Sequence, residues 1–308
     1  MKKVLKITVL ILFTLFISYL IIPTGHIIKI GETPKSYTLS MVLELNNVVD
    51  PAVVLLVPQR DNEQTVHVEA ITSVFDNGFV NISWRRKQAP GGEVMYGVFP
   101  TGSYSGRLQI NYSVTVSAST TVWLPALTHS FSMGGTDWGS TSLVESTVAE
   151  FKGEGVLALK SIYDYVSGIE YTDFHTPSFA RSVNDVIQTK KGRCDDKALT
   201  FATLVGKKGF DVSIEVGFTP NLILHAWNRI QVDGNGVSLD TTGDAFFYDS
   251  GNIRYYTVDA GYIFNGTGSA FSAVATVPLL FDNSPLIAVG GERGQVAIIT
   301  GYIFGPKE

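Results

Sequence analysis

The amino-acid sequence changes its hydrophobic period near residue 148, and this change separates regions that must fold differently. From Ile28 to Val148, β-branched and aromatic residues alternate with polar ones or cluster in short runs, as in TVHVEAITSVF and FVNISW. Such runs are typical of strands, and the DNG triplet between these two is a hairpin signal. The sequence therefore predicts an all-β, sandwich-like module over residues 28–148.

After this point the apolar residues first take helical spacing. One predicted helix is marked by residues on a single face, namely Val156, Leu159, Ile162, Tyr163 and Val166. A second helix is predicted from Asp195 to Lys207, and Gly209 ends it. Three strand-like runs follow, FDVSIEVGF, HAWNRIQV and VSLDTT, of which the last two are joined by DGNG. Helices followed by antiparallel strands predict an α+β core over residues 149–250.

The last segment, residues 251–308, is β-like again. Its runs PLIAV and QVAIITGYIF flank GGERG, a pattern that predicts a hairpin. Both runs are too short and too interrupted to span a bilayer. We therefore predict a C-terminal β extension and no membrane span in this segment.

The N-terminal segment, residues 1–25, has the pattern of a membrane-inserting sequence. Lys2, Lys3 and Lys6 precede an apolar run from Ile7 to Ile22. Basic residues before such a run predict a cytoplasmic N-terminus and an extracytoplasmic body. The sequence SYLIIPTGH at the end of the run lacks a small-residue cleavage site, which favours an uncleaved anchor over a cleaved signal peptide.

Composition narrows the classes of function. Hydrophobic residues make up 45% of the 308 residues and charged residues 17%, which permits a sizeable core and argues against disorder. The net charge of -5 argues against a nucleic-acid partner, because such proteins usually present a basic surface. One cysteine excludes an internal disulfide.

That single cysteine, Cys194 in GRCDDKAL, stands at the predicted start of the second helix. A thiol reacts as its thiolate, and a helix N-terminus or a neighbouring imidazolium favours that anion. Gly192 permits a tight turn before the cysteine. The unpaired backbone N–H groups of the first helical turn are available to an oxyanion. The position therefore suits a nucleophile.

His225 and Asp240 are the candidate base and orienting acid. If the Asp-Gly pair of DGNG forms a two-residue turn, Val232 pairs with Asn235. In that register Asp240 falls opposite Trp227, on the same face as His225 and within diagonal reach of it. A slip of one residue would place the two side chains on opposite faces.

Each of these residues also has a purely structural interpretation. Cys194 would then pack as a small hydrophobic residue, and His225 would be a hydrogen-bonded histidine of the core. Asp240 would cap the turn that contains Thr241 and Thr242. The hypothesis of a catalytic site depends on the order and context of the three residues together.

Several separated motifs, in the order GRCDDKALTFATLVGKKGFDVSIEVGF, HAW and VSLDTT, resemble the transglutaminase-like superfamily. The resemblance extends from Val156 to Thr242 and implies a papain-like α+β fold of helices and an antiparallel sheet. It also implies a triad in which Cys194 attacks an amide carbonyl and His225 transfers the proton. Asp240 would hold the histidine tautomer.

Some positions depart from the family pattern or allow two roles. Thr241 stands where many members have proline, and Arg193 stands where animal transglutaminases carry glutamine, which argues against close kinship with those calcium-dependent cross-linkers. Gln188, six residues before Cys194, has a papain-like spacing for an oxyanion donor, or else faces solvent in a turn. Asp196 matches an acidic position of the family or stabilises the helix N-terminus.

These observations predict a membrane-anchored, extracytoplasmic cysteine acyl-transfer enzyme that hydrolyses amide bonds of surface proteins or wall peptides. A cross-linking transglutaminase is one alternative, and a non-catalytic surface-binding or adhesion module is the other. The predicted partners are a protein or peptide substrate and, through the N-terminal segment, a membrane. We predict no cofactor and no metal, because DGNG suits a hairpin turn better than a calcium site.

Overall fold

The computed structural model describes residues 28–31, 34–76, 78–89, 92–117, 119–122, 138, 140–172, 181–221, 223–232, 235–243, 245–249, 251–258, 287–292, 295–299 and 303–304. The predicted membrane-inserting segment, residues 1–25, lies outside these ranges. Within them, no helix combines the length and the apolar character that a membrane crossing requires.

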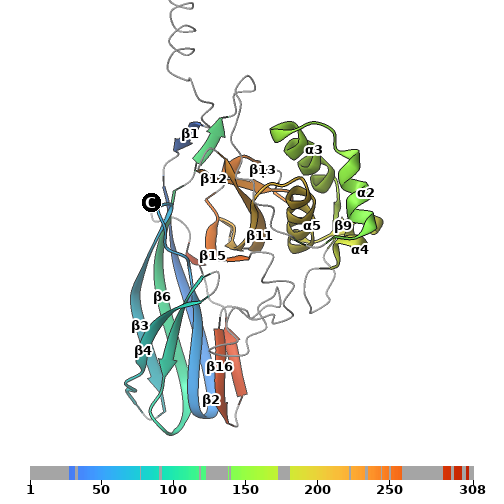
Figure 1. The fold of residues 1–308 in the computed structure, drawn as a ribbon. Coiled ribbons are helices and arrows are strands. Elements are labelled where there is room, and N and C mark those ends of the chain that lie inside the picture. Colours follow the sequence, from blue (N-terminus) through green and yellow to red (C-terminus); the bar gives the residue numbers. More distant parts are fainter. Residues whose placement is uncertain are drawn as a thin grey trace, which may run out of the picture.

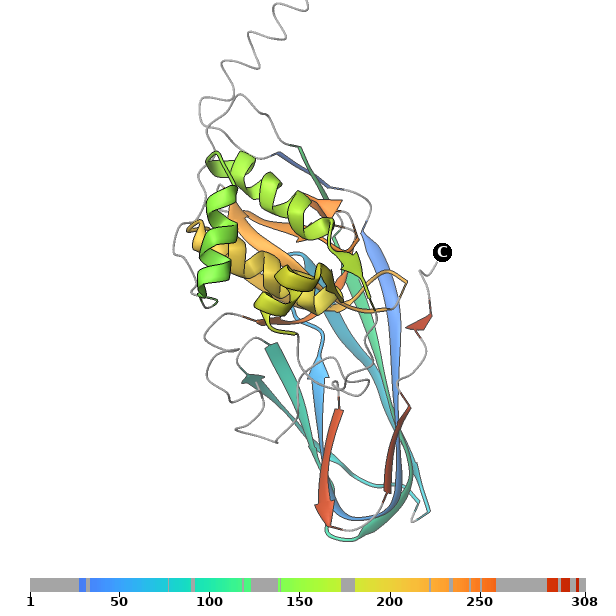
Figure 2. The same ribbon diagram turned by 90° about the vertical axis from the view of Figure 1, so that its right-hand side faces the viewer.

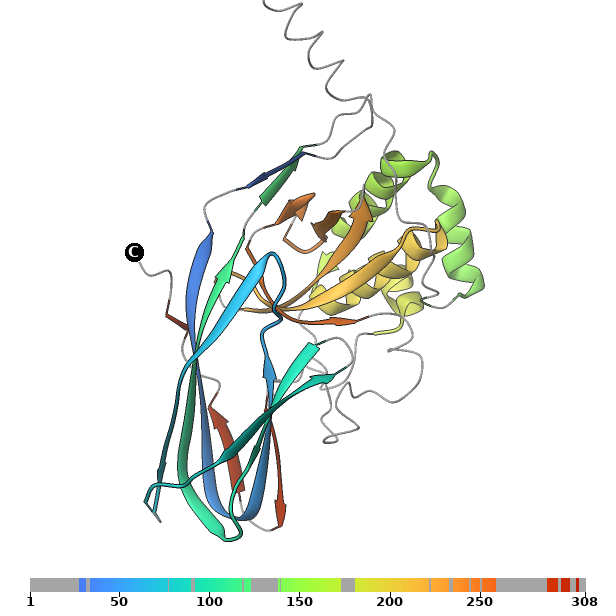
Figure 3. The same ribbon diagram turned by 60° about the vertical axis from the view of Figure 1, so that its left-hand side comes forward.

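The N-terminal region is rich in strands, as predicted. These strands are β1 (Ile28–Gly31), β2 (Lys35–Val57), β3 (Gln64–Phe75), β4 (Ser83–Ala89), β5 (Gly92–Val98), β6 (Ser103–Val116) and β7 (Ser119–Val122). The 23-residue strand β2 pairs with β6 along its first part and with β5 along its second part. Figure 3 shows β2, β3 and β6 as long strands that run side by side. We call this region the β module.

The core that follows has helices packed against an antiparallel sheet. Its helices are α2 (Ser142–Glu150), α3 (Gly155–Ser167), α4 (Val183–Thr189) and α5 (Cys194–Lys207). Its strands are β8 (Glu170–Tyr171), β9 (Lys191–Gly192), β10 (Val212–Phe218), β11 (Leu224–Val232), β12 (Asn235–Asp240), β13 (Ala245–Phe246), β14 (Tyr248–Asp249) and β15 (Ile253–Val258). Figures 1 and 2 show the helices gathered on one side of this sheet, so the predicted α+β class is confirmed.

Most predicted elements lie where the sequence pattern placed them, but two helices, α2 and α4, were missed. Helix α2 begins at Ser142, inside the segment predicted to be strand-like. The side chain of Thr141 accepts a hydrogen bond from the backbone N–H of Val144 and caps this helix. The β-branched residues of STSLVESTV are typical of strands, so the sequence pattern did not predict a helix cap here.

The β module and the core share one sheet instead of forming a separate sandwich and a separate core sheet. Among the described strands, the order β13-β12-β11-β10-β15-β5-β2-β6-β3 runs through a 13-stranded sheet. The junction is the antiparallel pair between Tyr256 on β15 and Gly92 on β5. The sequence pattern did not predict this junction, because strand spacing does not reveal which edges meet.

The C-terminal segment is β-like, as predicted, but among the described residues its strands pair with β2 and not with each other. Strands β16 (Ile287–Glu292), β17 (Gln295–Ile299) and β18 (Ile303–Phe304) all pair antiparallel with β2. They follow one another along the same long strand, with a register irregularity between Gly290 and Glu292. A long edge of β2 therefore satisfies the backbone groups that a hairpin would have paired with each other.

Gly217 offers a test of the close contact between β10 and β15. A Cβ atom at this position would lie 1.8 Å from the carbonyl oxygen of Ile253, so Gly217→Ala forces the backbones apart. We expect a loss of about 1–3 kcal/mol in the free energy of unfolding, as for other overpacked sites, measured by calorimetry. Gly168→Ala is the matched control, because its Cβ would lie 3.3 Å from the nearest atom, the Asp164 carbonyl oxygen. Equal stability of the two variants would contradict this account.

Candidate active site

The turn that leads into α5 is held by a close packing of backbone segments. Cys194 is the first residue of α5, and strand β9 immediately before it pairs in parallel with β8. A Cβ atom on Gly192 would lie 2.9 Å from the Cβ of Asp196. Only glycine fits this position without displacing the first turn of the helix, which supports the role predicted for Gly192.

Asp196 stabilises this turn through both of its carboxylate oxygens. Its Oδ2 accepts a hydrogen bond of 2.9 Å from the backbone N–H of Arg193, and its Oδ1 accepts one of 2.5 Å from the backbone N–H of Arg181. The side chain is 1% exposed. Asp196 therefore stabilises the N-terminus of α5, one of the two roles that the sequence left open.

Asp195 and Arg193 form an ion pair beside the cysteine. The Arg193 guanidinium donates to Asp195 Oδ2 at 2.8 Å. Burial and the neighbouring charge of Asp196 raise the pKa of Asp195, although the Arg193 charge opposes this shift. The other carboxylate oxygen, Oδ1, is buried and has no hydrogen-bond partner. The pair neutralises charge close to Cys194.

The predicted register of β11 and β12 is confirmed. Val232 pairs with Asn235, and the pairing continues without interruption to Asn228 opposite Leu239. One further step in this register brings Asp240 opposite Trp227. The side chains of His225 and Asp240 therefore lie on one face of the sheet, as the sequence argument required.

The structure brings the three predicted catalytic residues together. His225 Nε2 lies 2.7 Å from Asp240 Oδ2, and Cys194 lies near enough to the same ring to contribute to its pKa shift. Because Nε2 is engaged by Asp240, Nδ1 is the ring nitrogen left for another partner. The residues are 9%, 7% and 8% exposed for Cys194, His225 and Asp240 respectively. This arrangement is compatible with the predicted nucleophile, base and orienting acid.

The electrostatics of this group favour a charged imidazole. Burial lowers the pKa of His225, but the hydrogen bonds to Asp240 and Cys194 and their negative charges outweigh burial and raise it from 6.5 to about 10. Burial likewise raises the pKa of Asp240, and the bond and charge of His225 more than reverse that effect. The pair is therefore ionised at neutral pH.

Asp240 is held by groups other than the histidine. Its Oδ1 accepts hydrogen bonds from the backbone N–H groups of Thr242 and Gly243 at 2.9 and 2.8 Å. The buried hydroxyl of Tyr163 on α3 donates to the Asp240 carbonyl oxygen at 3.0 Å. These bonds leave Oδ2 directed at the imidazole.

Two neighbours of His225 complete the surroundings of the site. The indole of Trp227 lies nearly parallel to the imidazole, with ring centroids 6.1 Å apart, and is 2% exposed. The amide of Asn228 donates to the carbonyl oxygen of Ala198 on α5 at 3.0 Å, so it ties the strand of the histidine to the helix of the cysteine. The sequence argument missed Asn228. Its only signal was an amide on the otherwise apolar face of β11.

Gln188, the predicted oxyanion donor, lies exposed near the end of α4. No hydrogen bond between its side chain and the three residues occurs in the described part of the chain, so its role stays a prediction. The same described part contains no group of three or more histidine, cysteine, aspartate or glutamate side chains that could hold a metal ion.

Comparison with known proteins identifies the core. Residues 142–241 match the family model of the transglutaminase-like superfamily, which confirms the predicted resemblance for this segment. A search of curated proteins found no match. The structure of a protein from Cytophaga hutchinsonii, provisionally described as a cysteine protease, matches with a TM-score of 0.54 at 14% identity, over 91% of this chain and 95% of that one. At this identity the likeness shows a shared fold and nothing further.

Two other solved structures match more weakly. LapG from Legionella pneumophila matches with a TM-score of 0.33 at 14% identity, over 38% of this chain and 72% of that one. A protein from Parabacteroides distasonis, provisionally described as a protease, matches with a TM-score of 0.25 at 11% identity, over 70% of this chain and 66% of that one. Likenesses of this strength support no argument about this chain.

The raised pKa of His225 predicts how stability depends on pH. Between pH 6.5 and about 10 the folded state holds a proton on His225 that the unfolded state has lost, so the free energy of unfolding falls as pH rises through this range. We expect His225→Gln to remove this part of the slope, on the order of a few kcal/mol in total. Urea unfolding at a series of pH values measures it.

The matched control is His67→Gln, which changes an exposed histidine of β3. This variant should keep the slope of the wild-type protein. Parallel curves for the wild-type protein and His225→Gln would show that Asp240 and Cys194 do not stabilise the charged imidazole.

Proposed function

We propose, on the premise that residues 142–241 carry a transglutaminase-like core, that this protein is a cysteine acyl-transfer enzyme that hydrolyses amide bonds. One observation supports this most directly: the buried His225 ring bonds to Asp240 at 2.7 Å and lies beside Cys194 at the start of α5. A surface-binding module has no chemical need for these three groups side by side.

In the first half of the proposed reaction, Cys194 is acylated. The charged imidazole of His225 favours the thiolate form of a neighbouring sulfur. The sulfur attacks the amide carbonyl carbon, and the backbone N–H groups of the first turn of α5 donate to the oxyanion that forms. The carbon–nitrogen bond then breaks as the imidazolium gives its proton to the leaving amine, which leaves a thioester on Cys194.

In the second half, the thioester is cleaved. His225, now neutral, takes a proton from water, and the resulting hydroxide equivalent attacks the thioester carbonyl. The carbon–sulfur bond then breaks, the carboxylic acid leaves, and the thiolate of Cys194 and the imidazolium of His225 are restored. Asp240 holds the ring so that Nδ1 faces the sulfur throughout. A primary amine in place of water would give cross-linking, which experiment must distinguish.

We further propose a protein or peptide substrate, because a triad of this kind acts on amide carbonyls. The basic residues before the apolar run of residues 7–22 support a body that lies outside the cytoplasm and is anchored by this segment. In that compartment, surface proteins and wall peptides are the available polymers with amide bonds.

Alkylation tests the nucleophile directly, because Cys194 is the only thiol in the chain. We expect iodoacetamide to label the folded protein rapidly near neutral pH, and His225→Ala to slow labelling by about 10²-fold or more. Mass spectrometry measures the rate. His67→Ala, at an exposed histidine, should leave it unchanged. A thiol that does not react in the folded wild-type protein would contradict the enzymatic hypothesis and favour a binding module.

The rate of substrate hydrolysis tests the proposed role of Asp240 as the orienting acid. Asp240→Asn should lower hydrolysis of fluorescein-labelled casein by about 10²-fold or more, because the amide cannot hold the imidazolium as the carboxylate does. Asp164→Asn is the control, since the exposed Asp164 side chain forms an ion pair with the exposed Lys160 on α3. Incorporation of dansylcadaverine into casein, in place of hydrolysis, would show that the enzyme is a transglutaminase.

A further inference from the structure

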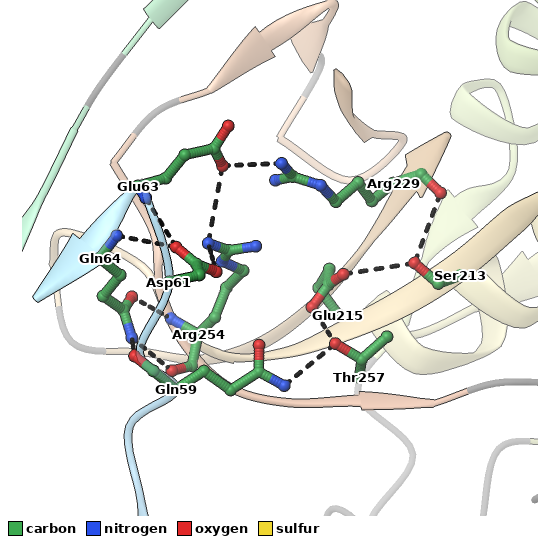
Figure 4. Close-up of polar contacts among 9 residues, drawn as sticks. All are labelled: Gln59, Asp61, Glu63, Gln64, Ser213, Glu215, Arg229, Arg254 and Thr257. Atoms are coloured by element: carbon green, nitrogen blue, oxygen red, sulfur yellow. Dashed lines mark hydrogen bonds and ion pairs between the residues drawn. The ribbon is translucent and has the colours of Figure 1, made fainter. Parts of the chain in front are cut away.

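A cluster of charged side chains joins the β module to the core sheet (Figure 4). Glu63, in the connection between β2 and β3, lies 2.7 Å from the Arg229 guanidinium on β11. Its carboxylate is also 3.6 Å from Arg254 on β15, which forms a second ion pair with Asp61. Two arginines of the core sheet are thus neutralised by two acids of the β module. We call these four residues the interface cluster.

Two glutamines attach the same connection to the backbone of β15. Gln64 is 1% exposed, and its amide both donates to the carbonyl oxygen of Arg254 and accepts from its N–H, each at 2.8 Å. The backbone N–H of Gln59 donates to the same carbonyl oxygen at 2.9 Å. Gln64 therefore pairs with Arg254 much as a neighbouring strand would, across 190 residues of sequence.

A buried acid lies beneath the interface cluster. Glu215 on β10 is 2% exposed and is hydrogen bonded to the hydroxyls of Ser213 and Thr257. Burial raises its pKa, although the charges of Arg254 and Arg229 oppose the shift. The two acids and two arginines of the interface cluster balance in charge, which lowers the cost of burying them.

The interface cluster lies on the face of the sheet to which His225 and Trp227 point, opposite the face on which Asn228 contacts α5. Residues paired directly across antiparallel strands share a face, and Gly217, Glu215 and Ser213 pair with His225, Trp227 and Arg229 in turn. Arg229 is four residues from His225 on β11, a distance of about 13 Å along the strand. The β module therefore covers the side of the sheet on which His225 and Trp227 lie.

The burial of the partners shows how firmly the two parts are joined. The side chains of Arg229 and Arg254 are 13% and 9% exposed, whereas Glu63 and Asp61 are 24% and 37% exposed. Removal of Glu63 would take an acidic partner from the buried side chain of Arg229, and removal of Asp61 would take one from Arg254, which is more costly than loss of a surface ion pair. The positive charges of Arg229 and Arg254 in the core sheet are thus neutralised by acids of the β module.

We propose that the β module forms a wall of the active site, and that Glu63 is a positioning residue that acts through Arg229 on the strand of His225. This inference rests on the proposed function, because it assigns the wall to the same site. With the wall in place, water is kept from the bond between His225 and Asp240. Loss of Glu63 weakens the wall, and water then screens the carboxylate that holds the proton on the imidazole.

The test compares Glu63→Gln, Arg229→Gln and the double variant, with Arg229→Lys as a milder change that keeps the charge but loses the guanidinium fork. Glu44→Gln is the matched control, because Glu44 pairs with Arg107 on the exposed surface of the β module alone. The measurements are the iodoacetamide labelling rate of Cys194, the NMR titration of the His225 ring, and hydrogen exchange of the backbone amides.

We expect Glu63→Gln to slow labelling roughly tenfold, the equivalent of about 1.4 kcal/mol and a typical coupling between groups in contact. The titration midpoint of His225 should move down from about 10, and the amides of β10 and β11 should exchange faster. The double variant should lose less than the two single variants added together. Arg229→Lys should show the same changes in smaller measure, which covers the case in which Glu63→Gln fails to fold.

The proposal is overturned if Glu63→Gln and Arg229→Lys match Glu44→Gln in labelling rate and His225 titration, and faster exchange stays within the connection between β2 and β3. The interface cluster would then only fasten the two parts. Failure of the proposed function looks different: the wild-type thiol would itself be inert. In that case the hydrogen-exchange rates of the backbone amides in β10 and β11 still show whether the β module shields this face of the sheet.

Discussion

The packing of α5 against β11 is the contact on which the candidate site depends. The inner face of the helix, including Phe201, Leu204 and Val205, is fully buried, and small residues such as Ala198 and Ala202 let the strand approach closely. The amide of Asn228 then bonds to the backbone of α5. Because helix and strand cannot slide past each other, the start of α5 stays beside the start of β11. Nucleophile and base therefore meet at the ends of two rigid elements.

The charged side chains of His225 and Asp240 are buried beside this contact. Burial of these charges costs electrostatic free energy, which hydrogen bonds from neighbouring groups offset. A buried imidazolium and carboxylate are tolerated because they bond to each other and because backbone N–H groups fill the remaining lone pairs of Asp240. Asp196 does the same for the turn before the helix. Among the described residues, the buried oxygens without a hydrogen-bond partner include Asp195 Oδ1 and Asn228 Oδ1. The buried polar groups therefore concentrate around the candidate site, where buried atoms without hydrogen-bond partners are often found.

The β module contacts the face of the sheet opposite α5, the face to which Arg229 points. It shares a continuous sheet with the core, and its ion pairs neutralise two arginines that belong to the core strands. Such an arrangement differs from a binding domain on a linker, whose interface would be small and mostly solvated. We therefore interpret the interface cluster as part of the structure that keeps water away from His225 and Asp240.

Local sequence patterns determined the elements that can be defined by periodicity and turn chemistry. The spacing from Val156 to Val166 predicted α3, and the Asp-Gly turn of DGNG predicted the register that places Asp240 near His225. Tertiary structure alone decided the pairing of the C-terminal strands with β2, the tie from Asn228 to α5 and the contact of Gln64 with Arg254. These contacts join residues far apart in the chain, and a hydrophobic period records which face of an element is buried but not against what.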